Sequence, residues 1–404
     1  MQGTQSGKRV NHDKRRKSGF FNRKERAEIT RYKAGIDRIF LIVVIVMVCA
    51  GTAMIFSASY VNALSRHGDS FFFVRRQIIM AAIGIALMIL ATYLADYRFI
   101  KKLALPFFIL ILVINYLTPV LGVTISGGHR WIMVPLIGQF QPSELLKLGV
   151  VLFFAWYIDK MGERMHKAKW GIGVPAAIIG VIGLAMLMQS HFSGFIILAC
   201  ICITIIFIGE APWQYIGAFV AICVGGIISV WVFSDRVIEM LGVRGGRIIS
   251  WVSPFEDPRG YGFQIIQSLY AIASGGLTGV GLGQSRQKFL YLPEPQNDFI
   301  FSIIAEELGF IGAIIIISMF VILIWRGIII AHHAPDKFSA FVVIGIIIKV
   351  AVQFILNLLV VTNTIPNTGI PLPFFSYGGT ALVVLLIEMG IILCISRYSY
   401  QEKA

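Results

Sequence analysis

One carboxylate stands where a long apolar run begins. Asp298 lies in Leu292-Pro-Glu-Pro-Gln-Asn-Asp-Phe-Ile-Phe301, where two prolines stiffen the approach to it. It could cap the helix that follows, because a helix N-terminus stabilises negative charge. The same position would hold a carboxylate rigidly at the membrane surface, as a general base requires. Glu294 is either a second functional carboxylate or an ordinary solvated acid.

A second pair of charges falls inside an apolar run. Glu144 and Lys147 are three residues apart and therefore share one helix face. They follow Gln141-Pro-Ser143, and proline suits the first turn of a helix. We expect a span that begins near Pro142 with an ion pair just below the outer surface. That pair is either a structural salt bridge or a cationic anchor for an anionic headgroup.

Arg130 and Trp131 lie just before that span, in Ser126-Gly-Gly-His-Arg-Trp-Ile132. One interpretation is an interfacial tryptophan beside an arginine whose charged end reaches toward water. The other is a phosphate site, because an arginine beside a glycine-rich turn can bind phosphate through two hydrogen bonds.

Four further charges lie at membrane depth, where ionisable groups are costly. We expect Glu306 and Glu307, about two helical turns below Asp298, to make hydrogen bonds between helices. Lys349 and Glu388 are expected to pair across the last two spans.

Two irregular segments flank these charges. The glycine-rich run 275–283 lacks the strand–turn–helix context of a dinucleotide site, so it predicts close-packed backbone beside the site. Residues 366–380 hold three prolines and three glycines, which predicts a rigid loop that walls a cavity. Within this loop Ser376 is a candidate cap for the last span.

The composition of the chain indicates the environment in which these residues lie. The chain has 404 residues, of which 57% are hydrophobic and only 14% charged, with a mean hydropathy of +0.80. Soluble domains carry about 25% charged residues, so a water-soluble enzyme is excluded. All five cysteines lie in apolar runs, which rules out a disulfide framework or a zinc site.

The apolar runs predict an all-α integral membrane protein, since a spanning helix needs roughly 20 apolar residues. Residues 39–398 form the predicted membrane domain, after a basic tail 1–38 and before a short C-terminus 399–404. Ten spans are expected, at 39–60, 77–95, 103–121, 142–158, 171–188, 194–208, 214–233, 298–325, 338–361 and 379–396.

The distribution of basic residues predicts the orientation. The tail and the loops on its side of the membrane carry 23 Lys/Arg, against four in the short loops of the other side. By the positive-inside rule, both termini are cytoplasmic. The segment 234–297 is then a long extracytoplasmic loop, with short amphipathic helices anchored by Trp251, Tyr261 and Tyr270.

With these motifs in view, the chain resembles the SEDS family (FtsW, RodA, SpoVE) across its membrane part. The resemblance rests on ordered motifs, namely His129-Arg-Trp-Ile132, Phe140-Gln-Pro-Ser-Glu-Leu-Leu-Lys147, the Asp298 segment with Glu306-Glu-Leu-Gly309, and Gly369-Ile-Pro-Leu-Pro-Phe-Phe-Ser-Tyr-Gly-Gly379. Ser285-Arg-Gln-Lys-Phe-Leu-Tyr-Leu-Pro293 is more similar to the division or sporulation branch than to the elongation branch.

The resemblance implies a peptidoglycan glycosyltransferase. Its substrate would be lipid II, a disaccharide-peptide on undecaprenyl pyrophosphate, polymerised into β-1,4 glycan at the outer face of the bacterial membrane. Its partners would be a class B penicillin-binding protein and other division proteins, at the division septum, with no nucleic acid.

The chain departs from the family pattern at several positions. His191 stands where the family often has an acid, Gln296-Asn297 replaces the usual His-Thr, and Asn363 and Asn367 also differ. These changes leave Asp298 intact, and no catalytic role is carried onto His191.

The hypothesis for mechanism is one inverting displacement with one base. Asp298 would deprotonate the acceptor 4-hydroxyl, while cations stabilise the leaving pyrophosphate. The substrate-binding candidates are Arg130, Trp131, Gln141, Ser143, Glu144, Lys147, Lys288, Glu294 and Ser376, with Arg244 and Arg247 as further cations.

A divalent cation (Mg²⁺ or Mn²⁺) could share the leaving-group charge, although no acidic cluster in the sequence demands one. Two alternatives stay open. A lipid II flippase would use buried Lys147, Lys349 and Glu388 to line a translocation path. A non-catalytic division scaffold would use the basic tail as its partner surface.

Overall fold

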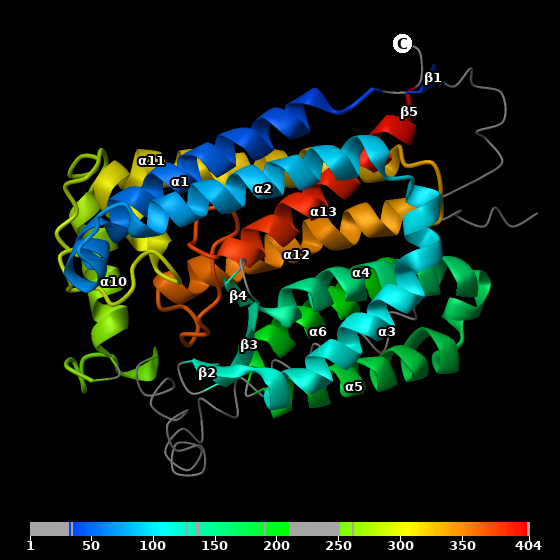
Figure 1. The fold of residues 1–404 in the computed structure, drawn as a ribbon, viewed down its shortest axis with the longest axis horizontal. Helices are drawn as coiled ribbons and strands as arrows, with labels where there is room; N and C mark the ends of the chain where they lie inside the picture. Colours follow the sequence, from blue (N-terminus) through cyan, green and yellow to red (C-terminus); the bar gives the residue numbers. More distant parts are fainter. Residues whose placement is uncertain are drawn as a thin grey trace, which may run out of the picture.

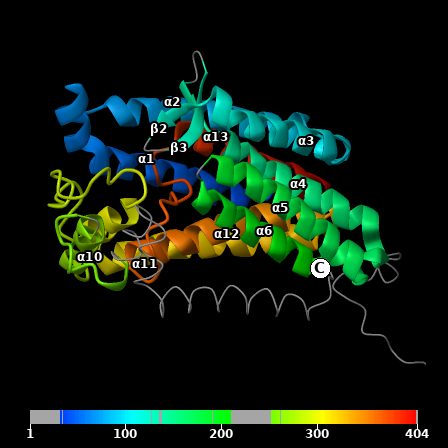
Figure 2. The ribbon, with the colours of Figure 1, turned by 90° about the horizontal axis from the view of Figure 1, so that it is seen from below.

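The computed structural model describes residues 32–33, 35–125, 128–134, 138–189, 191–209, 251–260 and 262–401. Long helices run side by side as one bundle, and the shorter α10 lies at one end of it (Figures 1 and 2). The helices are α1 (Arg38–His67), α2 (Phe72–Leu94), α3 (Tyr97–Leu121), α4 (Pro142–Met161), α5 (Val174–Met188), α6 (Phe192–Ile208), α10 (Phe263–Gly275), α11 (Ile300–His332), α12 (Lys337–Val361) and α13 (Gly379–Tyr398).

Each predicted span that falls within the described residues corresponds to a helix, while the predicted span 214–233 lies outside them. In the part of the chain that the structure describes, seven helices are long and apolar enough to cross a membrane. Of the others, α6 is shorter, and α4 carries charges at both ends. A 3₁₀ turn (Gly162–His166) and a π-helical turn (Lys169–Gly173) join α4 to α5.

Both ends of the described chain lie at one end of the bundle, here called the inner end (Figure 1). Asp37 caps α1 by accepting a 2.9 Å hydrogen bond from the Phe40 amide, and its own amide donates to Ser396 Oγ. Beyond these contacts, β1 (Tyr32–Lys33) pairs with β5 (Tyr400–Gln401). The placement of both termini on one side is therefore confirmed.

A small antiparallel sheet at the outer end was not predicted. It consists of β2 (Val123–Ile125), β3 (Gly128–Val134) and β4 (Gly138–Phe140), in the order β2-β3-β4. Gly138 begins β4 with φ +85°, a conformation that favours glycine. The hairpin delivers the chain to Gln141, the N-cap residue of α4, so it orients the residues just before that helix.

The glycine-rich run breaks α11. Gly309 has φ +66° and ψ −167°, so α11 is two helical segments rather than one continuous span. At the break, Phe310 and Ile311 donate to the carbonyls of Gly276 and Leu277, and Val280 donates to the Glu306 carbonyl. The loop thus takes over hydrogen bonds that the helix would otherwise make. Its backbone is close-packed, as predicted, but the packing is against the break in α11.

The long outer segment contains the helix α10, as expected from the prediction of short amphipathic helices in 234–297, and Tyr270 lies on it. Trp251 Nε1 donates to the Thr364 carbonyl at 3.1 Å, and the Trp251 carbonyl accepts from Asn363 Nδ2 at 3.2 Å. Trp251 therefore anchors the loop between α12 and α13 rather than a lipid surface alone. Arg244, Arg247 and Tyr261 lie outside the described residues.

Candidate active site

A cavity of about 500 Å³ lies at the outer end of the bundle and is here called the outer cavity. Its walls come from α2, β3, β4, the start of α4, the turn between α5 and α6, residues 294–298, α12, α13 and the α12–α13 loop (residues 362–378). Most of the predicted site residues line it: Arg130, Trp131, Gln141, Glu144, Lys147, Glu294, Asp298 and Ser376.

Asp298 is half-buried in this cavity, immediately before α11. The N-cap position of α11 is occupied by Phe299, so Asp298 lies one residue before it. An ideal Cβ built on Gly369 would approach Asp298 Oδ2 to 3.1 Å, which places the carboxylate against the backbone of the α12–α13 loop. Asn357 Nδ2 donates to the Asp298 carbonyl at 2.8 Å.

Glu294 is exposed at the cavity and already has two partners. Its carboxylate forms a 3.0 Å ion pair with Arg66 and accepts a 2.8 Å hydrogen bond from Asn297 Nδ2. These contacts fit an orienting role better than that of a second base, because both carboxylate oxygens already have partners.

The predicted ion pair of α4 is confirmed. Lys147 Nζ lies 2.7 Å from Glu144 Oε1, and both side chains are almost fully buried, at 4% and 9% exposure. The second predicted pair is also confirmed, since Lys349 Nζ contacts both Glu388 carboxylate oxygens at 2.6 and 2.7 Å. Lys147 and Lys349 both line the outer cavity, from α4 and α12.

Two arginines line the cavity from different elements. Arg130 comes from β3, beside Trp131, and Arg76 comes from α2. Arg76, counted among the four basic residues of the short outer loops, lies on α2 and was not predicted as a site residue. Its position four residues into a helix, after the apolar Phe71-Phe-Phe-Val74, offered no sign that it faces a cavity.

The turn between α5 and α6 places His191 in the cavity wall. Burial, together with the charges of Arg130 and Lys147, lowers the pKa of His191 from 6.5 to about 4. Its ring packs against Gly194, where a Cβ would approach within 2.6 Å. His191 is therefore a neutral wall residue near pH 7.

Ser376 does not cap the last span, because Gly378 is the N-cap of α13 and no side chain caps that helix. Instead, Ser376 Oγ donates to the Asn297 carbonyl at 2.5 Å and accepts from the Leu372 amide at 2.7 Å. The Tyr377 amide donates to the Gln296 carbonyl at 2.8 Å. These bonds join the α12–α13 loop to the segment that carries Asp298.

Two predicted site residues lie elsewhere. Lys288 is buried under the glycine-rich loop, where its Nζ forms a 3.0 Å ion pair with Glu307, and Ser57 Oγ donates to the same carboxylate at 2.7 Å. Because Glu307 lies at the break in α11, Lys288 stabilises that break rather than the outer cavity. Ser143 is buried in the first turn of α4 and does not line the cavity.

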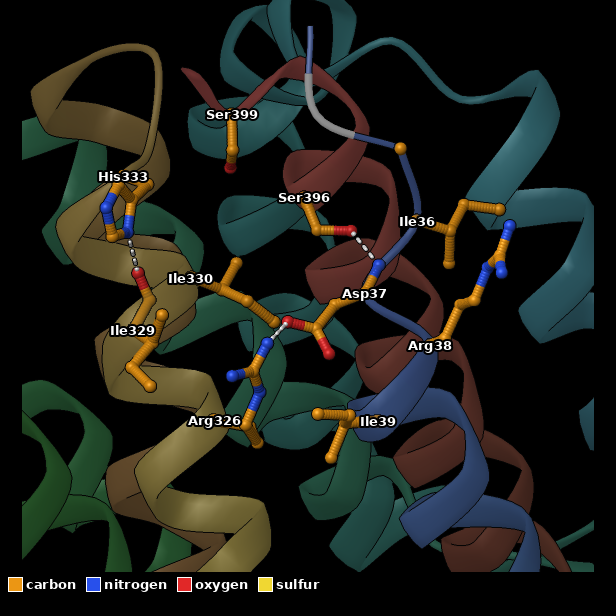
Figure 3. A pocket seen from close by; sticks show the side chains of 11 residues that line it. Ile36, Asp37, Arg38, Ile39, Arg326, Ile329, Ile330, His333, Ser396 and Ser399 are labelled. Carbon is orange, nitrogen blue, oxygen red and sulfur yellow. Dashed lines mark hydrogen bonds and ion pairs between the residues drawn. The ribbon is translucent and has the colours of Figure 1, made fainter. Parts of the chain in front are cut away.

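Another cavity, of about 580 Å³, lies at the inner end. Figure 3 shows Arg326 of α11 paired with Asp37, whose amide is bonded to Ser396 of α13. These contacts join the starts and ends of three helices. The site that holds Asp298 is at the opposite end of the bundle.

The geometry allows acid–base chemistry on an anionic substrate. Asp298 shares the outer cavity with four cationic side chains, those of Arg76, Arg130, Lys147 and Lys349. Two of these, Lys147 and Lys349, are held by glutamates, so they keep fixed positions. Preorganised cations of this kind can stabilise a departing phosphate.

Comparison with known proteins shows the family to which the chain belongs. The FTSW_RODA_SPOVE family, described as "Cell cycle protein", matches residues 37–401. "Stage V sporulation protein E" of Bacillus subtilis is 42% identical over 377 residues, covering 92% of this chain and all of that protein. A "Probable peptidoglycan glycosyltransferase FtsW" of Geobacter sp. is 37% identical, covering 90% of this chain and 97% of that protein.

Solved structures share the fold. A chain from "Structural coordination of polymerization and crosslinking by a peptidoglycan synthase complex" superposes with a TM-score of 0.71 and 27% identity, covering 90% of this chain and 98% of that one. The Thermus thermophilus rod shape determining protein RodA gives a TM-score of 0.65 at 24% identity, covering 91% and 98%. The chain therefore belongs to the FtsW, RodA and SpoVE family of cell cycle proteins.

Proposed function

We propose that this protein is an inverting peptidoglycan glycosyltransferase that polymerises lipid II at the outer face of the membrane. The observation that carries the proposal is the placement of Asp298 in one cavity with Lys147 and Arg130, at the end of the bundle away from both termini. The family's FtsW members carry the name of this activity, which supports the same assignment here.

The proposed step forms one bond and breaks one. The 4-hydroxyl oxygen of the acceptor sugar bonds to the anomeric carbon of the donor, and the bond from that carbon to the lipid pyrophosphate breaks. Asp298 takes the hydroxyl proton. Lys147 and Arg130 balance the charge that develops on the leaving pyrophosphate, so no general acid is required.

The other lining residues would orient the substrate. Trp131 offers an apolar face for a sugar or lipid segment, and Gln141 offers hydrogen bonds at the start of α4. Ser376 and Glu294 act on the protein itself, because their polar atoms are engaged with the segment around Asp298.

A divalent cation is proposed to arrive with the pyrophosphate rather than to reside in the protein. Among the described residues, no group of three or more His, Cys, Asp or Glu side chains could hold a metal ion. Glu144 and Glu294 are also committed to Lys147 and Arg66.

We further propose a class B penicillin-binding protein as partner and the division or sporulation septum as location. Similarity to a chain from a peptidoglycan synthase complex supports the first, and similarity to a stage V sporulation protein supports the second. Lipid II and other division proteins complete the proposed partners.

The test is lipid II polymerisation by the purified chain in detergent, with and without its penicillin-binding protein. Long glycan strands are the expected product. A parallel assay in proteoliposomes measures the accessibility of lipid II headgroups. Headgroup movement without polymer would support the flippase alternative, and neither activity from folded protein with its partner would support the scaffold.

A further inference from the structure

The amide side chain of Asn357 lies directly behind Asp298. Asn357 is in the last turns of α12, and it is fully buried. Its Nδ2 donates to the Asp298 carbonyl and to the Ile370 carbonyl, both at 2.8 Å. One amide group therefore joins the segment that carries the proposed base to the loop that walls the cavity.

We propose that Asn357 is a positioning residue for Asp298, which sets where the carboxylate lies relative to the α12–α13 loop. This inference rests on the proposed function, in which Asp298 is the general base. It concerns a residue of α12 that does not itself line the outer cavity.

The two hydrogen bonds act on geometry in a definite way. The two N–H bonds of a carboxamide diverge in one plane, so accepting both fixes the two carbonyls relative to each other. Fixing the Asp298 carbonyl fixes the peptide plane that follows it, and with it the direction in which the side chain leaves the backbone.

The carboxylate end of Asp298 is set by the same loop. Gly369, next to Ile370, has φ +65°, and a Cβ there would come 3.1 Å from Asp298 Oδ2. Asn357 thus restricts the position of the Asp298 backbone, and Gly369 restricts the position of its carboxylate. Both residues belong to α12 or the α12–α13 loop, so a shift of this region would move both contacts.

Asn357 is suited to this task because its own position is rigid. It lies on a helix, and the neighbouring Val360 and Val361 are fully buried as well. Sites built on helices hold their geometry more closely than sites built on loops. An isosteric hydrocarbon at this position would keep the packing and remove both donors.

The experiment compares Asn357→Leu, Asp298→Asn, Asp298→Glu and Ser268→Ala with wild type in lipid II polymerisation. Ser268 is the matched control, because its buried hydroxyl also donates to a backbone carbonyl at the end of α12, that of Val361 at 2.8 Å, and its other partner is Ser302 Oγ at 2.7 Å. Turnover, the KM for lipid II and the melting temperature in detergent are measured for each variant.

We expect Asn357→Leu to lose about 10- to 100-fold in kcat, since a misplacement of about 1 Å costs on the order of 100-fold. Its KM should stay within about threefold of wild type, because binding contacts remain. Ser268→Ala should keep wild-type turnover at a comparable melting temperature. A double variant, Asn357→Leu with Asp298→Glu, should lose less turnover than the product of the fold-losses of the two single variants, because the two residues act on the same geometry.

Two results would overturn the inference. One is Asn357→Leu within about twofold of wild-type turnover while Asp298→Asn is inactive, which leaves the proposed function intact. The other is equal loss of turnover in Asn357→Leu and Ser268→Ala in proportion to melting temperature, which indicates a structural role only. Normal turnover of Asp298→Asn removes the proposed base, and the inference with it.

Discussion

Lys349 on α12 and Glu388 on α13 form a buried ion pair in which the ammonium contacts both carboxylate oxygens, with exposures of 2% and 0%. Lys349 also lines the outer cavity. The pair therefore ties the two helices that flank the α12–α13 loop and holds one cation in the wall of the site.

Breaking this pair is expected to destabilise the protein strongly. Lys349→Met leaves Glu388 as an uncompensated buried charge, which costs about 3–5 kcal/mol. The double variant Lys349→Met with Glu388→Leu should recover much of that loss, because no unpaired charge remains. Melting temperatures in detergent measure both. A single variant as stable as wild type would contradict the account.

The role proposed for Lys147 can be separated from that of its partner. Lys147→Met removes a cation from the cavity, so we expect polymerisation to fall by about 100- to 1000-fold. Glu144→Gln keeps the lysine and the shape of its partner, and it should lose no more than about tenfold. Glycan yield per folded protein decides this, and equal losses in both variants would argue against charge stabilisation by Lys147.

The break in α11 depends on glycine. Gly309→Ala places a Cβ 2.2 Å from the Gly279 amide at a φ of +66°, and positive φ alone costs about 1–3 kcal/mol for a non-glycine residue. We expect a clear drop in melting temperature and in the yield of folded protein. Gly180→Ala is the control, because a Cβ there meets nothing within 4 Å and alanine favours a helix by about 1 kcal/mol. Opposite signs for the two variants are predicted.

The lowered pKa of His191 should make the stability of the protein depend on pH. Its folded-state pKa is lowered to about 4, whereas the unfolded chain takes up the proton near the ordinary value of 6.5. The unfolded state therefore binds more protons between these values, so the contribution of His191 falls as pH decreases from about 6.5 toward 4. His191→Gln should lose less melting temperature than wild type between pH 7 and pH 5. If the melting temperatures of wild type and variant fall equally between pH 7 and pH 5, protonation of His191 is not coupled to unfolding.

The parts of the site that follow local rules were predictable from the sequence. The spacing of Glu144 and Lys147 needs only the helical period, and Pro142 marks the start of that helix. The pairing of Lys349 with Glu388 follows from the cost of an unpaired charge in a membrane.

Other features depend on contacts between segments distant in sequence. Lys288 has the same side chain as a phosphate-binding lysine, but its partner Glu307 is placed beside it by the intercalated glycine loop. Ser376 sits close to a helix start, yet its hydroxyl reaches Asn297, which no local pattern specifies. The short strands β2 to β4 were missed because they pair with one another in a segment interrupted by glycines.

The central claim is that Asp298 removes the acceptor proton, and one comparison tests it most directly. Wild type, Asp298→Asn and Asp298→Glu are assayed for lipid II polymerisation with the penicillin-binding protein present, after matched melting temperatures confirm folding. Loss of a general base costs about 100- to 10,000-fold, so Asp298→Asn should make almost no glycan, while Asp298→Glu keeps a measurable fraction. Near-normal polymer from Asp298→Asn would contradict the account.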